Sequence, residues 1–383
     1  MPRQKGLTMS SHSTLSPSSA KRWLECPPSA MLCAGKSDEA SPYAMEGTCA
    51  HELCEYKLSK ALGYTCIDPT DNLDYYDSEM EMHAESYTDF VLAELAKAKD
   101  MCKDPEVLIE QPVSFTRWVP GGFGTADCII ASDDTLQIID FKYGVGVLVD
   151  AEWNPQMMLY ALGSLEIYDD IYDIKTIKMT IFQPRRDNIS TFTIEKSELL
   201  KWAHDYLQPQ AQLASEGKGE FKAGDHCIFC KVKDVCRKRA EYNLELTKYE
   251  FKQAGLLEDE EVADVLTKID NLTSWANDIK DYALKKSLEG VKFPGFKVVE
   301  GRSTRKYSNE DLVVEAVVQA GFDPYELKVA GITAMTARLG KEKFNELLGD
   351  LIIKPNGKPT LVPESDKRPE LGNAKDEFKE TKV

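Results

Sequence analysis

Three short apolar runs in the middle of the chain decide the fold: VLIEQPVSF (residues 107–115), FGTADCIIA (123–131) and TLQIIDFKY (135–143). Val, Ile, Phe and Thr recur in these runs at a period of two, which is typical of β-strands. Turn-forming residues at 132–134 separate the last two runs. We therefore expect an antiparallel meander that begins near residue 107 and ends near residue 143.

Helical patterns lie on both sides of these strands. Apolar residues at helical spacing predict helices before the meander at 20–26, 43–62 and 78–100. We expect Ser18 or Ser19 to cap the first of them. After the meander the order is a helix, two strands and an amphipathic helix, at about 154–166, 175–184, 189–195 and from 197 onward. This order predicts an α/β (α+β) fold with a mixed sheet flanked by helices.

The chain changes character after the last cysteine. Residues 240–290 are charged and mostly helical in pattern, 295–307 suggest a strand, and 313–348 suggest two or three short helices. We expect four segments: a disordered N-terminus (1–13), an α/β domain (14–240), a mainly helical C-terminal domain (241–370) and a disordered tail (371–383).

Composition indicates a protein of the cytoplasm. Among 383 residues, 42% are hydrophobic, which is enough for a core. The first twenty residues are polar, and nowhere do 18 apolar residues run together, so we expect neither secretion nor membrane association.

The net charge of −17 is unusual for a protein that binds nucleic acid, because phosphate recognition normally uses a basic surface. The charge is unevenly distributed, with 13 acidic and 3 basic residues across 68–110. Any DNA contact would therefore depend on local basic groups, for which the candidates are Lys21, Arg22, Arg185, Arg186 and the segment 231–239.

Four cysteines are candidates for a metal site. Cys227, Cys230 and Cys236 have the spacing C-x2-C-x5-C, and Cys26 supplies a fourth thiolate from the other end of the α/β domain. In a reducing compartment this clustering favours metal binding over disulfides. Spacing alone fits tetrahedral zinc as well as an iron–sulfur cluster. Cys33 is the alternative fourth ligand, and we expect the remaining cysteines to be ordinary thiols.

Three charged residues on neighbouring strands suggest hydrolytic chemistry. Asp127 lies on one predicted strand, and Asp140 and Lys142 lie on the next, where the i and i+2 positions share a face. A D-x-K on a strand is more often a solvated edge, but Asp140 directly follows the apolar run LQII. Paired carboxylates can bind Mg²⁺ or Mn²⁺, and a neighbouring lysine can orient water or offset negative charge.

Two helices supply further polar candidates. His51 lies on the predicted helix 43–62, where a neutral imidazole could be a third metal ligand. Gln156 and Tyr160 share a face of the helix 154–166 at i and i+4. Each of these residues taken alone would be an ordinary helix residue.

The order of these motifs resembles a known family. LSPSSAKRWLECP, EGTCAHELCE, GFGTAD, IIDFK, QMMLY and C-x2-C-x5-C follow one another as they do in the iron–sulfur branch of the PD-(D/E)XK nucleases. That branch includes RecB-like exonucleases, AddB-like helicase-nuclease subunits and CRISPR-adaptation nucleases. The resemblance covers residues 14–240, and the length and ending also look like a phage-encoded stand-alone family.

The resemblance implies a restriction-endonuclease-like core and a role for each motif residue. His51, Asp127, Asp140 and the Phe141 carbonyl would bind Mg²⁺ or Mn²⁺, and Lys142 would be the catalytic lysine. Gln156 and Tyr160 would help to hold DNA. A [4Fe–4S] cluster would be bound by Cys26, Cys227, Cys230 and Cys236.

The implied activity is a metal-dependent DNA exonuclease that acts on linear or single-stranded DNA ends during phage recombination or replication. A single-strand-binding or annealing protein and an oligomeric assembly are expected partners, and the location would be the host cytoplasm. No G-x4-G-K-[ST] ATPase motif is present in the sequence, which argues against a fused helicase. The alternatives are a noncatalytic DNA-end-binding or assembly subunit and a CRISPR-like integration role.

Overall fold

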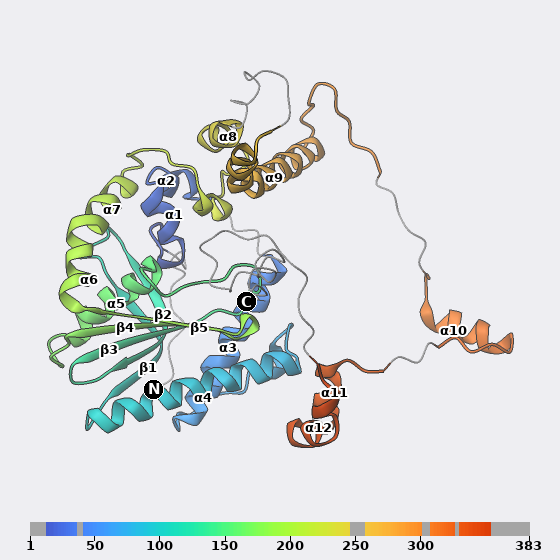
Figure 1. Ribbon diagram of the computed structural model, residues 1–383, viewed down its shortest axis with the longest axis horizontal. Coiled ribbons are helices and arrows are strands. Elements are labelled where there is room, and N and C mark those ends of the chain that lie inside the picture. Colours follow the sequence, from blue (N-terminus) through green and yellow to red (C-terminus); the bar gives the residue numbers. More distant parts are fainter. Residues whose placement is uncertain (1–12, 37–40, 246–256, 301–306, 326–328, 354–383) are drawn as a thin grey trace, which may run out of the picture. The chain divides into compact units, whose positions relative to one another are not determined.

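The computed structural model describes residues 13–36, 41–245, 257–300, 307–325 and 329–353 (Figure 1). The chain divides into two compact units: the first comprises 1–254 with 271–293, and the second comprises 255–270 with 294–383. The expected disordered termini therefore fall almost entirely outside the described residues. Compared with the expected division at residue 240, the first unit also takes in part of the later helical region.

A five-stranded mixed sheet forms the centre of the first unit. Its order is β1-β2-β3-β4-β5, and neighbours pair antiparallel except for the parallel pair β3–β4. A parallel pair needs a crossover, and helix α5 (Pro155–Tyr168) supplies it. The strands are Glu106–Ser114 (β1), Phe123–Ala131 (β2), Thr135–Phe141 (β3), Thr176–Gln183 (β4) and Asn188–Glu195 (β5). The predicted mixed α/β fold and its opening meander are confirmed.

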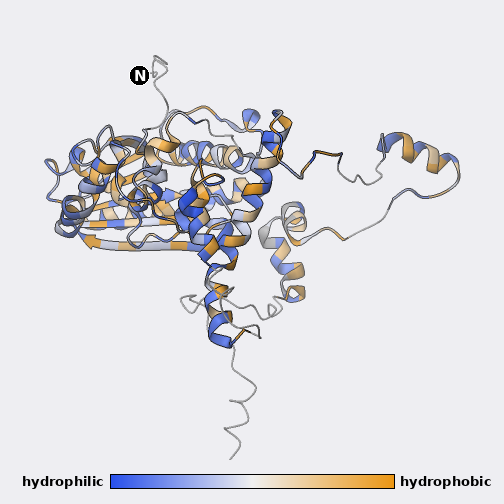
Figure 2. Ribbon diagram, turned by 90° about the horizontal axis from the view of Figure 1, so that it is seen from above, coloured by the Kyte–Doolittle hydropathy of each residue, from blue (hydrophilic) through white to orange (hydrophobic). Residues whose placement is uncertain are grey.

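Helices cover both faces of the sheet (Figure 1). Alternate residues of β3, such as Ile138 and Ile139, enter different cores because successive strand side chains point to opposite faces. Burial on both faces explains why Leu136, Ile138 and Ile139 are all apolar. One core includes α1 (Ala20–Glu25), α5, α6 (Lys196–Trp202) and α7 (Gln208–Ser215), and the other includes α3 (Pro42–Ala61) and α4 (Ser78–Met101). In Figure 2 hydrophobic and hydrophilic residues alternate along these helices.

Local capping sets where several helices begin. The Asp77 carboxylate accepts a 2.8 Å hydrogen bond from Met80 N at the start of α4. Ser19 is the N-cap residue of α1, but its side chain makes no capping bond and instead contacts Ser16, 2.9 Å away. Ser19 therefore occupies the predicted N-cap position, but the expected side-chain bond is not formed, because the hydroxyls of Ser18 and Ser19, in the 3₁₀ turn Pro17–Ser19, contact Ser16 instead.

Gly124 allows a close approach between β2 and the N-terminal segment. A Cβ at this position would lie 2.7 Å from Pro17 Cγ and 3.1 Å from Tyr160 Cε1. Such distances are too short for a side chain without displacing one neighbour. The second glycine of GFGTAD therefore lets Tyr160 pack closely beside the strand that carries Asp127.

The helix predicted from Ser197 runs through α6, a π-helical turn at Ala203–Leu207 and α7. Short elements link the larger ones: α2 (Ser29–Cys33) and 3₁₀ turns at Thr70–Asn72, Pro184–Arg186 and Asp225–Phe229. Helix α8 (Arg237–Leu244) follows the cysteines, and α9 (Asp259–Leu288) is the longest helix described.

The second unit contains α10 (Glu310–Gln319), α11 (Ile332–Leu339), α12 (Lys341–Leu348) and a 3₁₀ turn at Gly349–Leu351. The strand expected at 295–307 is wrong for its described part, since residues 295–300 and 307 are not in a strand. No described strand pairs with this segment, and Val299 is 67% exposed, so neither hydrogen bonds nor burial stabilise an extended conformation there. None of the described helices is both long and apolar enough to cross a membrane.

Candidate functional site

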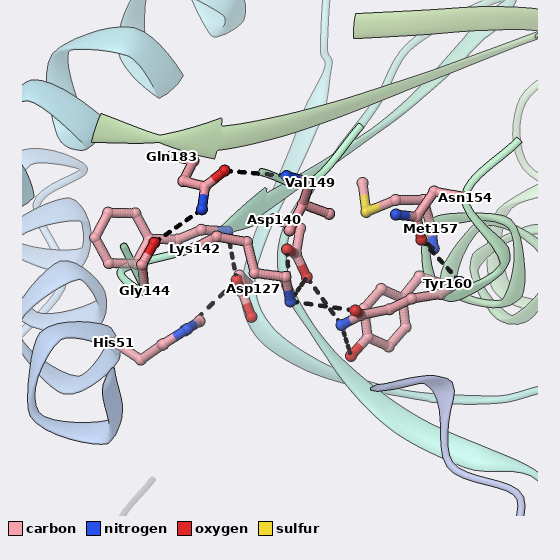
Figure 3. Close-up of polar contacts among 12 residues, drawn as sticks. His51, Asp127, Asp140, Lys142, Gly144, Val149, Asn154, Met157, Tyr160 and Gln183 are labelled. Carbon is pink, nitrogen blue, oxygen red and sulfur yellow. Dashed lines mark hydrogen bonds and ion pairs between the residues drawn. The ribbon is translucent and has the colours of Figure 1, made fainter. Parts of the chain in front are cut away.

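The side chain of Asp127 lies between helix α3 and strand β3 (Figure 3). Its Oδ2 is 3.5 Å from His51 Nδ1 and accepts a 2.7 Å hydrogen bond from Phe141 N. His51 reaches this position because Ala50, Leu53 and Cys54 are buried on the adjoining face of α3. The strand pairing places residue 127 next to residue 140, since Cys128 pairs with Ile139. Helix and sheet thus bring together residues that are 76 positions apart.

Glu110 joins this pair from strand β1. Ligand atoms of His51, Glu110 and Asp127 all lie within 4.8 Å of one another. The register of β1 and β2 places Glu110 opposite Asp127, and the ladder is interrupted at this one position. Glu110 has a φ of 47°, which is uncommon for a residue with a side chain. The interruption of the β1–β2 ladder and the positive φ therefore both occur at Glu110, the residue that supplies the carboxylate.

A second polar group lies beside His51 and Asp127 (Figure 3). Lys142 Nζ is 3.0 Å from Asp140 Oδ2 and donates a 3.2 Å hydrogen bond to Gln156 Oε1. Gln156 Nε2 in turn lies 3.1 Å from Asp140 Oδ1 and 3.2 Å from the Tyr160 hydroxyl. Asn154 caps α5 by accepting a 3.0 Å bond from Gln156 N, which orients the first turn of the helix. The D-x-K and Q-x3-Y residues thus form one network.

Burial governs the electrostatics of the site. It raises the pKa of the Asp127 carboxyl, and the rise is opposed by His51 and reinforced by Asp140. Burial would lower the pKa of Lys142, but the Asp140 and Asp127 carboxylates raise it above its ordinary value. Burial and the same carboxylates also raise the pKa of Tyr160. The lysine therefore remains an ammonium at neutral pH.

The residues fit a hard divalent cation. Asp140 is almost completely buried, and its Oδ2 accepts no hydrogen bond from the described residues, with only the Lys142 ammonium close by. Two carboxylates and an imidazole meet in the trio, and burial disfavours the charged form of Asp127. Mg²⁺ and Mn²⁺ prefer oxygen and imidazole ligands and would offset that charge.

The structure divides the metal ligands predicted from the sequence between two neighbouring groups. His51 and Asp127 belong to the compact trio, whereas Asp140 is held by Lys142 and Gln156 in the adjacent network. The Phe141 amide is engaged by Asp127, and the Phe141 ring packs in the core of α3 and α4. Sequence reasoning missed Glu110, although a charge inside the apolar run VLIEQPVSF is the same signal that singled out Asp140.

The four expected cluster ligands line one pocket in the first unit. Cys26 follows α1, and Cys227, Cys230 and Cys236 come from the segment between α7 and α8. His226 is buried beside them, and burial lowers the pKa of its imidazole. The N-terminal segment and the C-x2-C-x5-C segment therefore meet, as the resemblance implies.

The spacing of the sulfurs can be compared with that of a zinc site. In a tetrahedral zinc site with bonds of about 2.3 Å, every pair of sulfurs is about 3.8 Å apart. Within the described residues no three thiols lie within 4.8 Å of one another. The Sγ of the alternative ligand Cys33 lies 3.8 Å from Cys230 Sγ, which matches that spacing.

The expected DNA-contacting residues have different environments. Arg22 is buried, and its Nη1 donates to Ser29 O at 2.8 Å beside the thiol pocket, so its assignment to a DNA surface is wrong. Arg185 is paired with Glu46 at 3.0 Å and lies over the ring of Tyr143. Lys21 and Arg186 are exposed.

Part of the basic segment 231–239 is also engaged internally. Lys233 Nζ lies 2.8 Å from Asp278 Oδ1, and Arg239 Nη1 donates to Asp278 Oδ2 at 2.5 Å. Arg239 is almost completely buried. These two cations therefore pair with α9 inside the first unit.

Comparison with known proteins gives the family of the chain. Residues 12–369 match the family described as "Protein of unknown function (DUF2800)", and the chain belongs to this family. Among solved structures the chain is similar to one titled "Crystal structure of SSO0001", with 15% sequence identity over 50% of this chain and 98% of that chain. The TM-score is 0.22, which is too low to relate the two folds.

Proposed function

We propose that this protein is a Mg²⁺- or Mn²⁺-dependent DNA exonuclease of the iron–sulfur PD-(D/E)XK type. The observation that carries the proposal is the meeting of His51, Glu110 and Asp127 with the Asp140–Lys142–Gln156 network at one edge of the sheet. A ligand set for a hard cation next to a buried ammonium suits phosphodiester hydrolysis.

Each residue has a defined part in this proposal. His51, Glu110 and Asp127 would hold the cation, with Asp140 and the Phe141 carbonyl available at the same edge. When bound, the cation would act as a Lewis acid toward the phosphate and lower the pKa of water. The Lys142 ammonium offsets charge on the phosphate. Gln156 positions Lys142 and, with Tyr160, the DNA backbone.

The thiol pocket supports a structural [4Fe–4S] cluster held by Cys26, Cys227, Cys230 and Cys236. The pocket lies between two segments that are 200 residues apart in sequence, so a cluster bound there would link the beginning of the α/β domain to its end. The biological role that follows from such an enzyme is the resection of DNA ends in recombination or replication.

End-labelled linear duplex and single-stranded DNA, incubated with the protein and Mn²⁺, test the activity. We expect Lys142→Ala and Asp140→Ala to lower the rate about 100-fold or more. Lys142→Ala removes a cation that offsets charge on the phosphate, and Asp140→Ala removes the carboxylate that pairs with Lys142 and would be available to the metal ion. Lys201→Ala changes an exposed lysine on α6 and is the matched control. Circular DNA should resist degradation if ends are required.

Equal degradation by wild type and both site variants would refute this mechanism. Binding of DNA ends without cleavage under any divalent ion would instead favour the noncatalytic end-binding subunit.

A further inference from the structure

The loop that follows Lys142 presents apolar side chains to solvent at the edge of the candidate site. Val145 is 40% exposed, Val147 is 51% exposed and Leu148 is 56% exposed. We call residues 144–149 the apolar loop. A cluster of exposed aliphatic residues is characteristic of an interaction surface, because a partner that covers them removes apolar surface from water and so lowers the free energy.

The apolar loop is held in a fixed conformation by a buried amide. Gln183, at the end of β4, is 1% exposed and donates a 2.8 Å hydrogen bond from Nε2 to Gly144 O (Figure 3). A second 2.8 Å bond runs from Nε2 to Val147 O. Its Oε1 accepts from Val149 N at 3.2 Å, and Asn188 donates a 2.9 Å bond to Val149 O. These bonds prevent the loop from folding its aliphatic side chains inward, so the exposed arrangement is preorganised.

The position of the apolar loop indicates what covers it. Lys142, which contacts Gln156, lies two residues before the loop, so a ligand bound to Lys142 passes next to the start of the loop. Arg186, an exposed cation, donates to Val145 O at 3.2 Å. Trp153, 45% exposed, lies between the loop and α5. Cations beside exposed apolar and aromatic groups are the combination that binds single-stranded nucleic acid, with phosphates on the cations and bases on the apolar groups.

We propose that the apolar loop contacts the nucleobases of the DNA strand whose phosphate reaches Asp140 and Lys142. The inference rests on the proposed nuclease function and adds a substrate class to it, namely unpaired or frayed DNA ends. Bases within an intact duplex are stacked on each other and leave their faces unavailable, whereas unpaired bases can lie against Val147 and Leu148.

The test compares the double variant Val147→Ser/Leu148→Ser with wild type in fluorescence anisotropy. The probes are a labelled single strand and the same strand with abasic sites next to the labelled end, both with Ca²⁺ in place of Mn²⁺. We expect about fivefold to tenfold weaker binding of the base-bearing strand and little change for the abasic strand. Ile171→Ser alters an exposed aliphatic residue after α5 and should leave both affinities unchanged.

The outcomes separate this inference from the nuclease proposal. If wild type cleaves DNA and the double variant binds both probes as wild type does, only the loop inference is overturned. Equal weakening for both probes would mean a backbone contact and would also overturn it, as would altered self-association with unaltered DNA binding. If wild type neither binds nor cleaves DNA, both proposals are wrong.

Discussion

Glu110 shows how a single backbone conformation can shape a site. A residue with a side chain at positive φ costs about 1–2 kcal/mol, and β1 carries this conformation in its interior, opposite Asp127. Strain of this kind persists where the surrounding structure imposes it, and such positions are common at functional sites. The strained conformation coincides here with a carboxylate that lies close to His51 and Asp127.

At the residue scale we predict that Glu110→Gln weakens Mn²⁺ binding about tenfold or more, because one anionic ligand becomes neutral. Calorimetric titration and the electron paramagnetic resonance signal of Mn²⁺ measure the affinity independently of activity. Glu106→Gln, an exposed position on the same strand, is the control and should bind as wild type does. An unchanged affinity in Glu110→Gln would exclude this carboxylate from the metal site.

Among the elements, α4 is joined to the sheet by a buried charge cluster. Glu94 accepts hydrogen bonds from Lys178 on β4, from Gln137 on β3 at 3.0 Å and from Lys97 on its own helix at 2.7 Å. Burial alone would raise the pKa of Glu94, but these donors lower it from about 4.5 to about 2. The carboxylate form is therefore favoured in the folded state. Its bonds to β3 and β4 hold α4 on the face of the sheet that α3, the helix of His51, also covers.

At the element scale we predict a pH-dependent contribution to stability. Because the folded pKa of Glu94 lies below the unfolded value, the contribution is complete above about pH 4.5 and is lost as the pH falls toward 2. Glu94→Gln should lower the free energy of unfolding by about 2–3 kcal/mol at pH 7 and by much less near pH 2.5. Urea unfolding at both pH values measures the difference. A constant difference across this range would contradict the assignment.

At the scale of the whole molecule, the thiol pocket joins the start of the described chain to the segment after α7. Cys26 lies just beyond α1, and the other three cysteines lie 200 residues later. Asp278 of α9 pairs with Lys233 and Arg239 in the same segment, so ion pairs reinforce the connection. The first unit is therefore held together by side chains that are distant in sequence, in addition to its two apolar cores.

At this scale we predict that Cys227→Ser removes the brown colour and visible absorption of an iron–sulfur protein and lowers the melting temperature by about 5 °C or more. Metal analysis and thermal unfolding of the anaerobically purified protein are the measurements. Cys66→Ser changes an exposed cysteine and should retain both iron and melting temperature. A colourless wild-type protein with one zinc per chain would show that the cluster assignment is wrong.

Much of the first unit was predictable because the relevant signals are local. The alternation in FGTADCIIA and TLQIIDFKY depends only on neighbours two positions away, and β2 and β3 match these predictions closely. Helical spacing likewise predicted α3 and α4 to within a residue or two. The order of the motifs also predicted that His51 and Asp127 belong to one site, and their side chains do lie together.

What the sequence by itself determined were the elements, the meander and the identities of most candidate residues, since period and motif act over a few positions. Only the tertiary structure decided that Glu110 faces Asp127, that Arg22 is buried beside the thiols, and that Asp278 pairs with both Lys233 and Arg239. These contacts depend on strand register and helix packing between segments far apart in the chain. Such pairings are set by the burial of whole faces, which no local pattern specifies.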